Sequence, residues 1–360
     1  MPTQVPGDTR QEASACKKNE GSTRRSSRGH LVIAGCSSGA HLAGQVAQQC
    51  LESLSSAGFA RHPTHLANID YRFENSETCI RLDAEVEGAD VYVIQALCDP
   101  ASDQSVDDNY IALLAAGRAM REYGAAHVTA VIPYLAYGRQ DKPSEGRREP
   151  VTARLMADLT VAAGYDRVMT WHPHCGQLRG FYGGLPVHFL DPLPYFREAF
   201  AAFAGRDDSI VVAPDAGAAK LAIRVADNLD LRFAVGAKHR PARDTVEMGE
   251  IAGDFRRVRT ALVVEDELGT GGTAAALVAR LFGKIGVQEI RLAVSHNRCL
   301  EAAEDRLRSL NRNQGLAELV VTDSIPQTRA FRDLGFLRVH SLAEPVSAAI
   351  TNIHVGTRLL

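Results

Sequence analysis

The stretch from Val263 to Thr273 reads Val-Val-Glu-Asp-Glu-Leu-Gly-Thr-Gly-Gly-Thr. It runs from a hydrophobic strand through acidic residues into a glycine- and threonine-rich loop, and an alanine-rich helical segment follows. Glycines let backbone N–H groups approach phosphate oxygens closely, threonine hydroxyls add donors, and the start of the next helix is partly positive. The stretch therefore predicts a sugar-phosphate site, and the alternative is a structural turn capped by a threonine. The predicted phosphate-binding residues are Gly269, Thr270, Gly271, Gly272 and Thr273.

Two acidic residues precede this loop. Glu265 and Asp266 stand at the carboxyl end of the predicted strand. Ligands of α/β proteins bind at this edge of the sheet. Because two neighbouring carboxylates can hold vicinal ribose hydroxyls, the pair is a candidate site for the sugar itself.

Outward from this stretch, short apolar runs alternate with helical patterns. This alternation is typical of a mostly parallel sheet with helices on both faces, and two such α/β units of similar size fit the length of the chain. Predicted strands cover 31–35, 91–95, 127–133, 167–170, 210–213, 233–236, 260–264, 289–294 and 319–322. Predicted helices cover 40–57, 107–123, 151–164, 218–229 and 273–286.

The ends of the chain and the junction between the units have their own signals. Residues 1–29 are polar, mixed in charge and without hydrophobic periodicity, which predicts a disordered tail, with a basic docking tail as the alternative. Paired prolines in Asp191–Pro194 indicate a junction. We predict a first domain over 30–190, a second over 191–335, and a segment over 336–360 that folds back onto the first domain.

Composition excludes several classes of protein. The 40 Lys and Arg residues against 43 Asp and Glu residues give a net charge of −3, which argues against a nucleic-acid-binding protein. No apolar run approaches the roughly 20 residues needed to cross a bilayer, and the N-terminus lacks the apolar core of a signal peptide. The seven cysteines form no CxxC pair, which disfavours a disulfide framework or a zinc site. We expect a cytoplasmic protein with reduced thiols and no membrane partner.

The stretch around the glycine-threonine loop resembles the phosphoribosyl-pyrophosphate (PRPP) loop of the phosphoribosyltransferase superfamily. Further segments resemble, in order along the chain, those of one family within it, the ribose-phosphate pyrophosphokinases or PRPP synthetases. These segments are Phe73–Thr78, Tyr137–Lys142, Arg148–Ala153, Val212–Gly217, Lys238–Pro241, Ile251–Asp254 and Val320–Pro326. The resemblance implies two tandem phosphoribosyltransferase-like domains.

The resemblance also implies a reaction. A diphosphoryl group moves from ATP to the C1 hydroxyl of ribose 5-phosphate, which gives PRPP for nucleotide and purine biosynthesis together with AMP. Mg²⁺ is the implied cofactor, and the implied assembly is a homo-oligomer, commonly a hexamer built from dimers. Catalysis of this kind consists mostly of positioning and of neutralising phosphate charge.

Carried over residue by residue, the resemblance implies a role for individual side chains. The implied ATP-binding residues are Phe73, Asn75, Ser76 and Glu77, which reach into a neighbouring subunit's site, together with Arg139 and Gln140. The implied metal ligands are His174 and Asp215, although a histidine is an unusual ligand for Mg²⁺. The implied catalytic cations are Lys238 and Arg240, and Asp266 with the loop 269–273 holds the ribose phosphate.

The chain departs from the family pattern at the proposed site. Glu265 stands in place of the first aspartate, Gly269 removes a loop carboxylate, and His172 and Gly176 replace aspartates beside the metal histidine. Three hypotheses follow. The protein is an active PRPP synthetase, a weak or silent regulatory subunit, or a phosphoribosyltransferase that consumes PRPP, which the Glu265–Asp266 pair favours.

Overall fold

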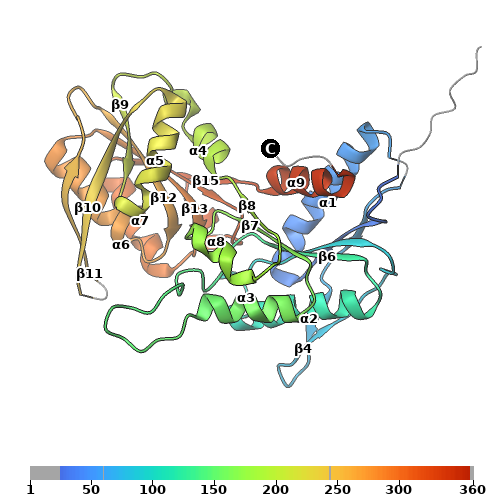
Figure 1. Cartoon of the computed structure of the whole chain (residues 1–360). Helices are drawn as coiled ribbons and strands as arrows, with labels where there is room; N and C mark the ends of the chain where they lie inside the picture. Colours follow the sequence, from blue (N-terminus) through green and yellow to red (C-terminus); the bar gives the residue numbers. More distant parts are fainter. Residues whose placement is uncertain (1–24, 60, 243–244, 357–360) are drawn as a thin grey trace, which may run out of the picture.

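The computed structural model describes residues 25–59, 61–242 and 245–356, with only the backbone for 239–242 and 245–246. Two sheets lie side by side (Figure 1). The first sheet has six strands, all paired in parallel, in the order β2-β1-β5-β6-β7-β8. Its strands are β1 (Leu31–Gly35), β2 (Thr64–Leu66), β5 (Asp90–Ile94), β6 (His127–Ile132), β7 (Arg167–Trp171) and β8 (Val187–Leu190).

Helices cover both faces of the first sheet because its central strands are apolar on both sides. In β1, Leu31 and Ile33 pack toward one helical layer, whereas Val32 and Ala34 pack toward the other. The first layer is α1 (Ala40–Ser56) with the C-terminal helix α9 (Ala343–Val355), and the second is α2 (Val106–Glu122) with α3 (Thr152–Ala162). A small antiparallel hairpin, β3 (Asp70–Arg72) and β4 (Thr78–Ile80), projects from this unit (Figure 1).

The second sheet has seven strands in the order β11-β10-β9-β12-β13-β14-β15, with β10 and β11 forming the one antiparallel pair. Apart from the extra edge strand β11, both sheets place their strands in the same order relative to the chain. The strands are β9 (Ser209–Ala213), β10 (Arg232–Ala242), β11 (Thr245–Ala252), β12 (Thr260–Leu268), β13 (Glu289–Asn297), β14 (Leu316–Thr322) and β15 (Leu337–His340). The helices are α4 (Leu193–Ala199), α5 (Ala216–Leu229), α6 (Gly272–Arg280), α7 (Glu301–Asn313) and α8 (Arg329–Arg332). Short helical turns complete the chain at Ser37–Gly39, Gly176–Tyr182, Ala201–Phe203 and, as a π-turn, Leu281–Ile285.

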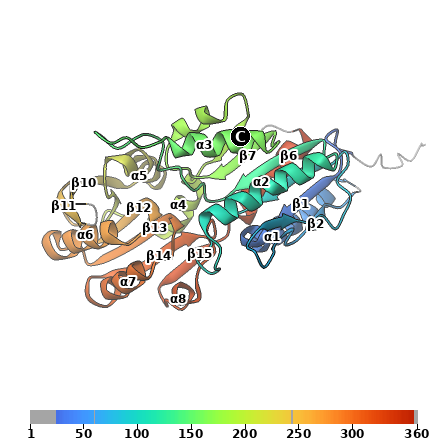
Figure 2. The same cartoon turned by 90° about the horizontal axis from the view of Figure 1, so that it is seen from below.

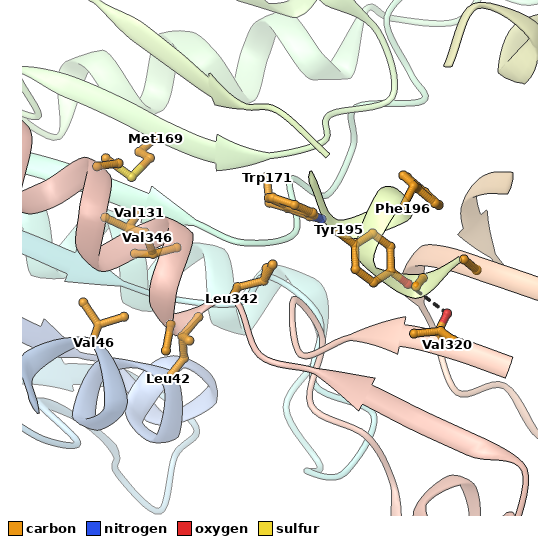
Figure 3. Close-up of a cluster of buried hydrophobic side chains, with 14 of the residues drawn as sticks. Leu42, Val46, Val131, Met169, Trp171, Tyr195, Phe196, Val320, Leu342 and Val346 are labelled. Carbon is orange, nitrogen blue, oxygen red and sulfur yellow. Dashed lines mark hydrogen bonds between the residues drawn. The ribbon is translucent and has the colours of Figure 1, made fainter. Parts of the chain in front are cut away.

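One hydrophobic cluster continues from the first sheet to the second. Trp171 at the end of β7 makes an edge contact with the ring of Tyr195 in α4 (Figure 3). The hydroxyl of Tyr195 donates to the carbonyls of Val294 and Val320 at 2.9 Å, so this buried tyrosine is anchored to the second sheet. The shared core fixes the two units relative to each other, and Figure 2 shows the two units from a second side.

Both ends of the described chain contact the first sheet. Arg28 and His354 each bind the buried carboxylate of Asp90, at 2.9 Å. The hydroxyl of Ser26 also donates to the carbonyl of His354. The tail boundary predicted at residue 29 therefore falls inside a segment that contacts the fold, and residues 1–24 lie outside the described chain. No helix in the described ranges combines the length and the apolar character that a bilayer span requires.

Candidate active site

A cavity of about 230 Å³ lies where carboxyl ends of strands from the two sheets meet. Loops after β5, β6 and β7 supply one wall, and the ends of β12 and β13 supply the other. Its polar and ionisable lining residues are Cys98, Tyr134, Tyr137, Arg139, Gln140, His174, Asp266, Glu267, His296 and Arg298. The predicted residues Arg139, Gln140, His174 and Asp266 thus come together from positions far apart in the sequence.

His174 and Asp266 form an ion pair between the two units. His174 Nδ1 lies 2.8 Å from Asp266 Oδ2. The hydrogen bond to Asp266 is the main reason why the pKa of His174 is raised above its ordinary value. Burial opposes ionisation of Asp266, but the bond from His174 and the nearby histidines outweigh it and lower the pKa to about 2. The pair is therefore ionised in mildly acidic solution.

The pKa of Glu265 is shifted in the opposite direction to that of Asp266. Burial, followed by the charge of Asp266, raises the pKa of Glu265 well above its ordinary range. Lys238 and Arg139 act against this rise, and Asp215 adds to it. These charges therefore lie within electrostatic reach of Glu265, which links the cavity to the Lys238–Asp215 pair.

Asp215 and Lys238 form this second pair beside the cavity. Asp215 caps helix α5, because its Oδ1 accepts from the backbone N–H groups of Gly217 and Ala218 at 2.9 and 3.3 Å. Its Oδ2 accepts from Lys238 Nζ at 3.0 Å. Lys238 lies on β10 of the β10–β11 hairpin, and the side chain of Arg240, farther along β10, lies outside the described atoms.

The glycine-threonine loop leads directly into α6. Gly271 has φ +75°, a conformation that favours glycine, and it occupies the N-cap position of the helix. No side chain caps this end of α6, in contrast to the threonine cap that the structural alternative predicts. Gly269 has open space around the position of a Cβ atom. The first N–H groups of α6 are therefore left to solvent or to an anion.

The hairpin segment 73–77 does not line the cavity of its own chain. Phe73 is 49% exposed, and Asn75 donates to the carboxylate of Glu77 at 2.8 Å. Ser76 has φ +72°, which closes the tight turn between β3 and β4. The structure thus separates these predicted ATP-binding residues from Arg139 and Gln140 within one chain.

The fold also brings to the site residues to which the sequence analysis gave no binding or catalytic role, among them His172, which it named only as a replacement beside the metal histidine. His172 Nδ1 lies 2.5 Å from Ser295 Oγ, and His296 Nε2 lies 3.0 Å from the carbonyl of His172. Burial, followed by the charge of His296, lowers the pKa of His172 to about 4, so this ring is neutral at physiological pH. Both contacts tie β7 to β13. Tyr134, Glu267 and Arg298 were also missed, and their only signal is a position at or next to a strand end.

The described residues make no closed metal cage. Among them, no group of three or more His, Cys, Asp or Glu side chains is placed to hold a metal ion. His174 and Asp215 are each engaged by another side chain of the site. Mg²⁺ commonly binds through one or two carboxylates together with substrate phosphates and water. The carboxylates present therefore fit the few protein ligands that a magnesium ion commonly takes.

Comparison with known proteins agrees with this geometry. A family model for the N-terminal domain of ribose phosphate pyrophosphokinase matches residues 31–164, and one for the phosphoribosyl transferase domain matches residues 195–312. The ribose-phosphate pyrophosphokinase of Clostridium acetobutylicum is 34% identical over 284 residues, which span 79% of this chain and 85% of that protein. The chain belongs to the ribose-phosphate pyrophosphokinase family.

Other members of the family support the same assignment. Ribose-phosphate pyrophosphokinase A of Dictyostelium discoideum is 33% identical over 79% of this chain and 86% of that protein. The crystal structure of phosphoribosylpyrophosphate synthetase from Mycobacterium smegmatis matches with a TM-score of 0.73 and 28% identity, over 90% of this chain and 98% of that one. The predicted family and the predicted α/β fold class are therefore confirmed.

Proposed function

We propose that the protein is an active ribose-phosphate diphosphokinase that converts ATP and ribose 5-phosphate into AMP and PRPP. The observation that carries this proposal is the meeting of Arg139 and His174 from the first unit with Asp266 from the second at one cavity. The uncapped start of α6 lies in the loop that follows Asp266 in the chain and suits a sugar phosphate.

In this reaction the C1 hydroxyl oxygen of ribose 5-phosphate attacks the β-phosphorus of ATP. The bond between that phosphorus and the oxygen bridging to the α-phosphorus breaks, AMP leaves with this oxygen, and the hydroxyl proton passes to solvent. Asp266 and Glu265 would hold the ribose, and loop 269–273 would hold the 5-phosphate. Mg²⁺ would neutralise phosphate charge, with His174 and Asp215 as its ligands.

The cations would then act on the phosphates. Lys238 is part of the β10–β11 hairpin and reaches the Asp215 end of the site, where it would stabilise charge that develops on the moving phosphoryl group. We assign the same role to Arg240. Arg139 and Gln140 would contact ATP from the wall formed by the loop after β6.

We extend the proposal to the assembly and the domain boundaries. The hairpin segment Phe73–Glu77 lies away from the cavity of its own chain, so it would complete the ATP site of a neighbouring subunit in a homo-oligomer. We assign the two units to 30–190 and 191–335, although β15, just beyond this second bound, still pairs with β14 in the second sheet. The segment 336–360 contributes α9, which packs on α1 of the first unit.

A weak or silent regulatory subunit is the second candidate. It is favoured by the carboxylate missing at Gly269 and by the replacements at His172 and Gly176. The experiment incubates the purified protein with ATP, Mg²⁺ and ribose 5-phosphate and follows AMP and PRPP. Sugar-dependent AMP formation supports the proposal, whereas nucleotide binding without turnover supports the silent subunit. Release of pyrophosphate from PRPP and a nucleobase would instead indicate a phosphoribosyltransferase.

A further inference from the structure

We propose that Arg298 is a second phosphate-binding guanidinium, which acts with Arg139 across the boundary between the two units on the phosphates of the nucleotide. The inference rests on the proposed function, because it takes ATP as the ligand. Nothing in the sequence pattern assigned a role to Arg298.

The two arginines meet at one buried carboxylate. Glu267 Oε1 lies 3.4 Å from Arg139 Nη1 and 3.5 Å from Arg298 Nη1. The side chain of Glu267 is only 6% exposed, whereas those of Arg139 and Arg298 are 47% and 39% exposed. The carboxylate therefore lies beneath the two guanidinium groups, which remain open toward solvent.

This arrangement leaves charge and donors unused. One carboxylate neutralises one of the two guanidinium charges, so the group retains one positive charge. Each guanidinium has five N–H donors in a planar fork that matches phosphate oxygens. Among the described contacts, each guanidinium binds Glu267 through only one of its nitrogens. The remaining donors can bind an anion without displacing Glu267.

The backbone holds Arg298 in place. Arg298 directly follows β13, and its N–H donates to the carbonyl of Leu268 at 3.0 Å. Glu267 lies opposite His296 in the parallel register of β12 and β13. Asp266, the other carboxylate of the cavity wall, is bound by His174. Among the described contacts it forms no ion pair with either arginine.

The cavity favours a phosphate chain over a whole nucleotide. Its volume of about 230 Å³ is below the roughly 300–1,000 Å³ of pockets that enclose a complete small-molecule ligand. The sugar 5-phosphate has a separate expected position at the start of α6. We therefore assign the arginine pair to the nucleotide, and the sugar phosphate is the alternative source of the anion.

The test compares Arg298→Ala with Arg338→Ala in the full chain. Arg338 is a matched control because it also shares a glutamate, Glu318, with a second arginine, Arg291, and is 43% exposed, but it does not line the cavity. Dissociation constants are measured by calorimetry for ATP, AMP and ribose 5-phosphate in the presence of Mg²⁺. Arg298→Lys, which keeps the charge and loses the fork, is measured in parallel.

We expect Arg298→Ala to raise the Kd for ATP at least about tenfold, to raise that for AMP less, and to leave ribose 5-phosphate binding unchanged. Arg298→Lys should give an intermediate Kd for ATP, and Arg338→Ala a wild-type value. Unchanged ATP binding in Arg298→Ala, or weaker binding of ribose 5-phosphate alone, overturns the assignment of Arg298. Failure of the wild-type protein to bind ATP overturns the proposed function as well, so the two failures are distinguishable.

Discussion

At the scale of single residues, the charged groups of the site are already paired with one another. Lys238 is bound to Asp215, His174 to Asp266, and Arg139 to Glu267. Under the proposed function, a phosphate that takes one of these cations would leave a carboxylate free for Mg²⁺. Substrate and metal should therefore bind with strong mutual dependence.

The charged residues of the candidate site could be proposed from the sequence, but which of them form ion pairs with one another could not. Asp266 and His174 are 92 positions apart in the chain and belong to different sheets. Their distance depends on how the two units pack, which local pattern does not encode. Arg298 carried no signal beyond its position after a strand, and a surface arginine at such a position is common in α/β proteins.

The first prediction concerns Lys238. Replacing it with alanine should lower kcat at least about a hundredfold, because the proposed function places this cation beside the transferring phosphates. The unfolding free energy should fall by less than about 1 kcal/mol, since the pair with Asp215 is partly exposed. Steady-state AMP formation and urea denaturation measure the two effects. Lys220→Ala, an exposed lysine on α5, is the control, and a wild-type kcat in Lys238→Ala would remove the role of this lysine.

The second prediction concerns the His174–Asp266 pair. The raised pKa of His174 stabilises the fold below pH 6.5, and this contribution is lost as the pH rises through the folded value. The lowered pKa of Asp266 stabilises the fold above pH 3.8, and that contribution is lost as the pH falls toward 2. The pair therefore contributes fully between pH 3.8 and 6.5.

Asp266→Asn should move the His174 midpoint down toward 6.5, as measured by the ring-proton NMR signal. His30 serves as an internal control, since burial, not Asp266, is the main cause of its lowered pKa. A His174 midpoint that does not move in the variant would show that Asp266 is not the partner that raises it.

At the scale of elements, the central strands were predicted well and the edges poorly. The predicted strand 31–35 coincides with β1, which is buried along its whole length and reads as a continuous apolar run. By contrast, β2 has three residues and β15 is half exposed, so neither shows an apolar run. The strand predicted over 233–236 extends as β10 to Ala242, because pairing with β11 in a hairpin stabilises residues that lack apolar character.

The third prediction concerns the loop before α6. Gly271→Ala should destabilise the protein by about 1–2 kcal/mol, because its φ of +75° is unfavourable for any residue with a Cβ atom. The added Cβ would also lie 3.4 Å from Ala303 Cα. Because the turn that leads into α6 would distort, ribose 5-phosphate should bind at least about tenfold more weakly by calorimetry.

Gly269→Ala is the matched control for stability. Gly269 has no atom within 4 Å of the position that a Cβ would take, and its φ is not positive. The melting temperature of the Gly269→Ala variant should therefore stay close to that of the wild type. Equal loss of stability in the two variants would mean that backbone conformation is not what requires glycine at position 271.

At the scale of the whole molecule, two sheets whose strand orders match, apart from the extra strand β11, meet at carboxyl ends of their strands and share one hydrophobic cluster. The alternating pattern indicated two such units, and the paired prolines indicated a junction near Asp191. Their mutual orientation depends on buried contacts such as Tyr195 with Val294 and Val320, which have no signature in a single sequence. The cavity between the units could therefore be expected only from family resemblance.

The last prediction concerns the hairpin between β3 and β4. The carboxylate of Glu77 accepts a hydrogen bond from the side-chain amide of Asn75. The backbone carbonyl of Glu77 accepts from the backbone N–H of Phe73 at 2.9 Å. Glu77 therefore shapes the tip of the hairpin, which carries the exposed ring of Phe73. If a neighbouring chain uses this tip to complete its ATP site, Glu77→Ala should raise the KM for ATP several-fold and leave that for ribose 5-phosphate unchanged. Glu85→Ala, an exposed glutamate outside the hairpin, should alter neither constant.

Complementation makes this last prediction specific to a site shared between chains. The Glu77→Ala and Lys238→Ala chains, each carrying a different affinity tag, are expressed together so that mixed oligomers form. In these oligomers, the intact cavity of a Glu77→Ala chain can meet the intact hairpin of a Lys238→Ala chain. At limiting ATP, where each variant alone turns over slowly, the doubly purified mixture should be more active than the sum of the two. Activity no higher than that sum, in oligomers shown by mass spectrometry to contain both chains, would mean that each chain's hairpin serves only its own site.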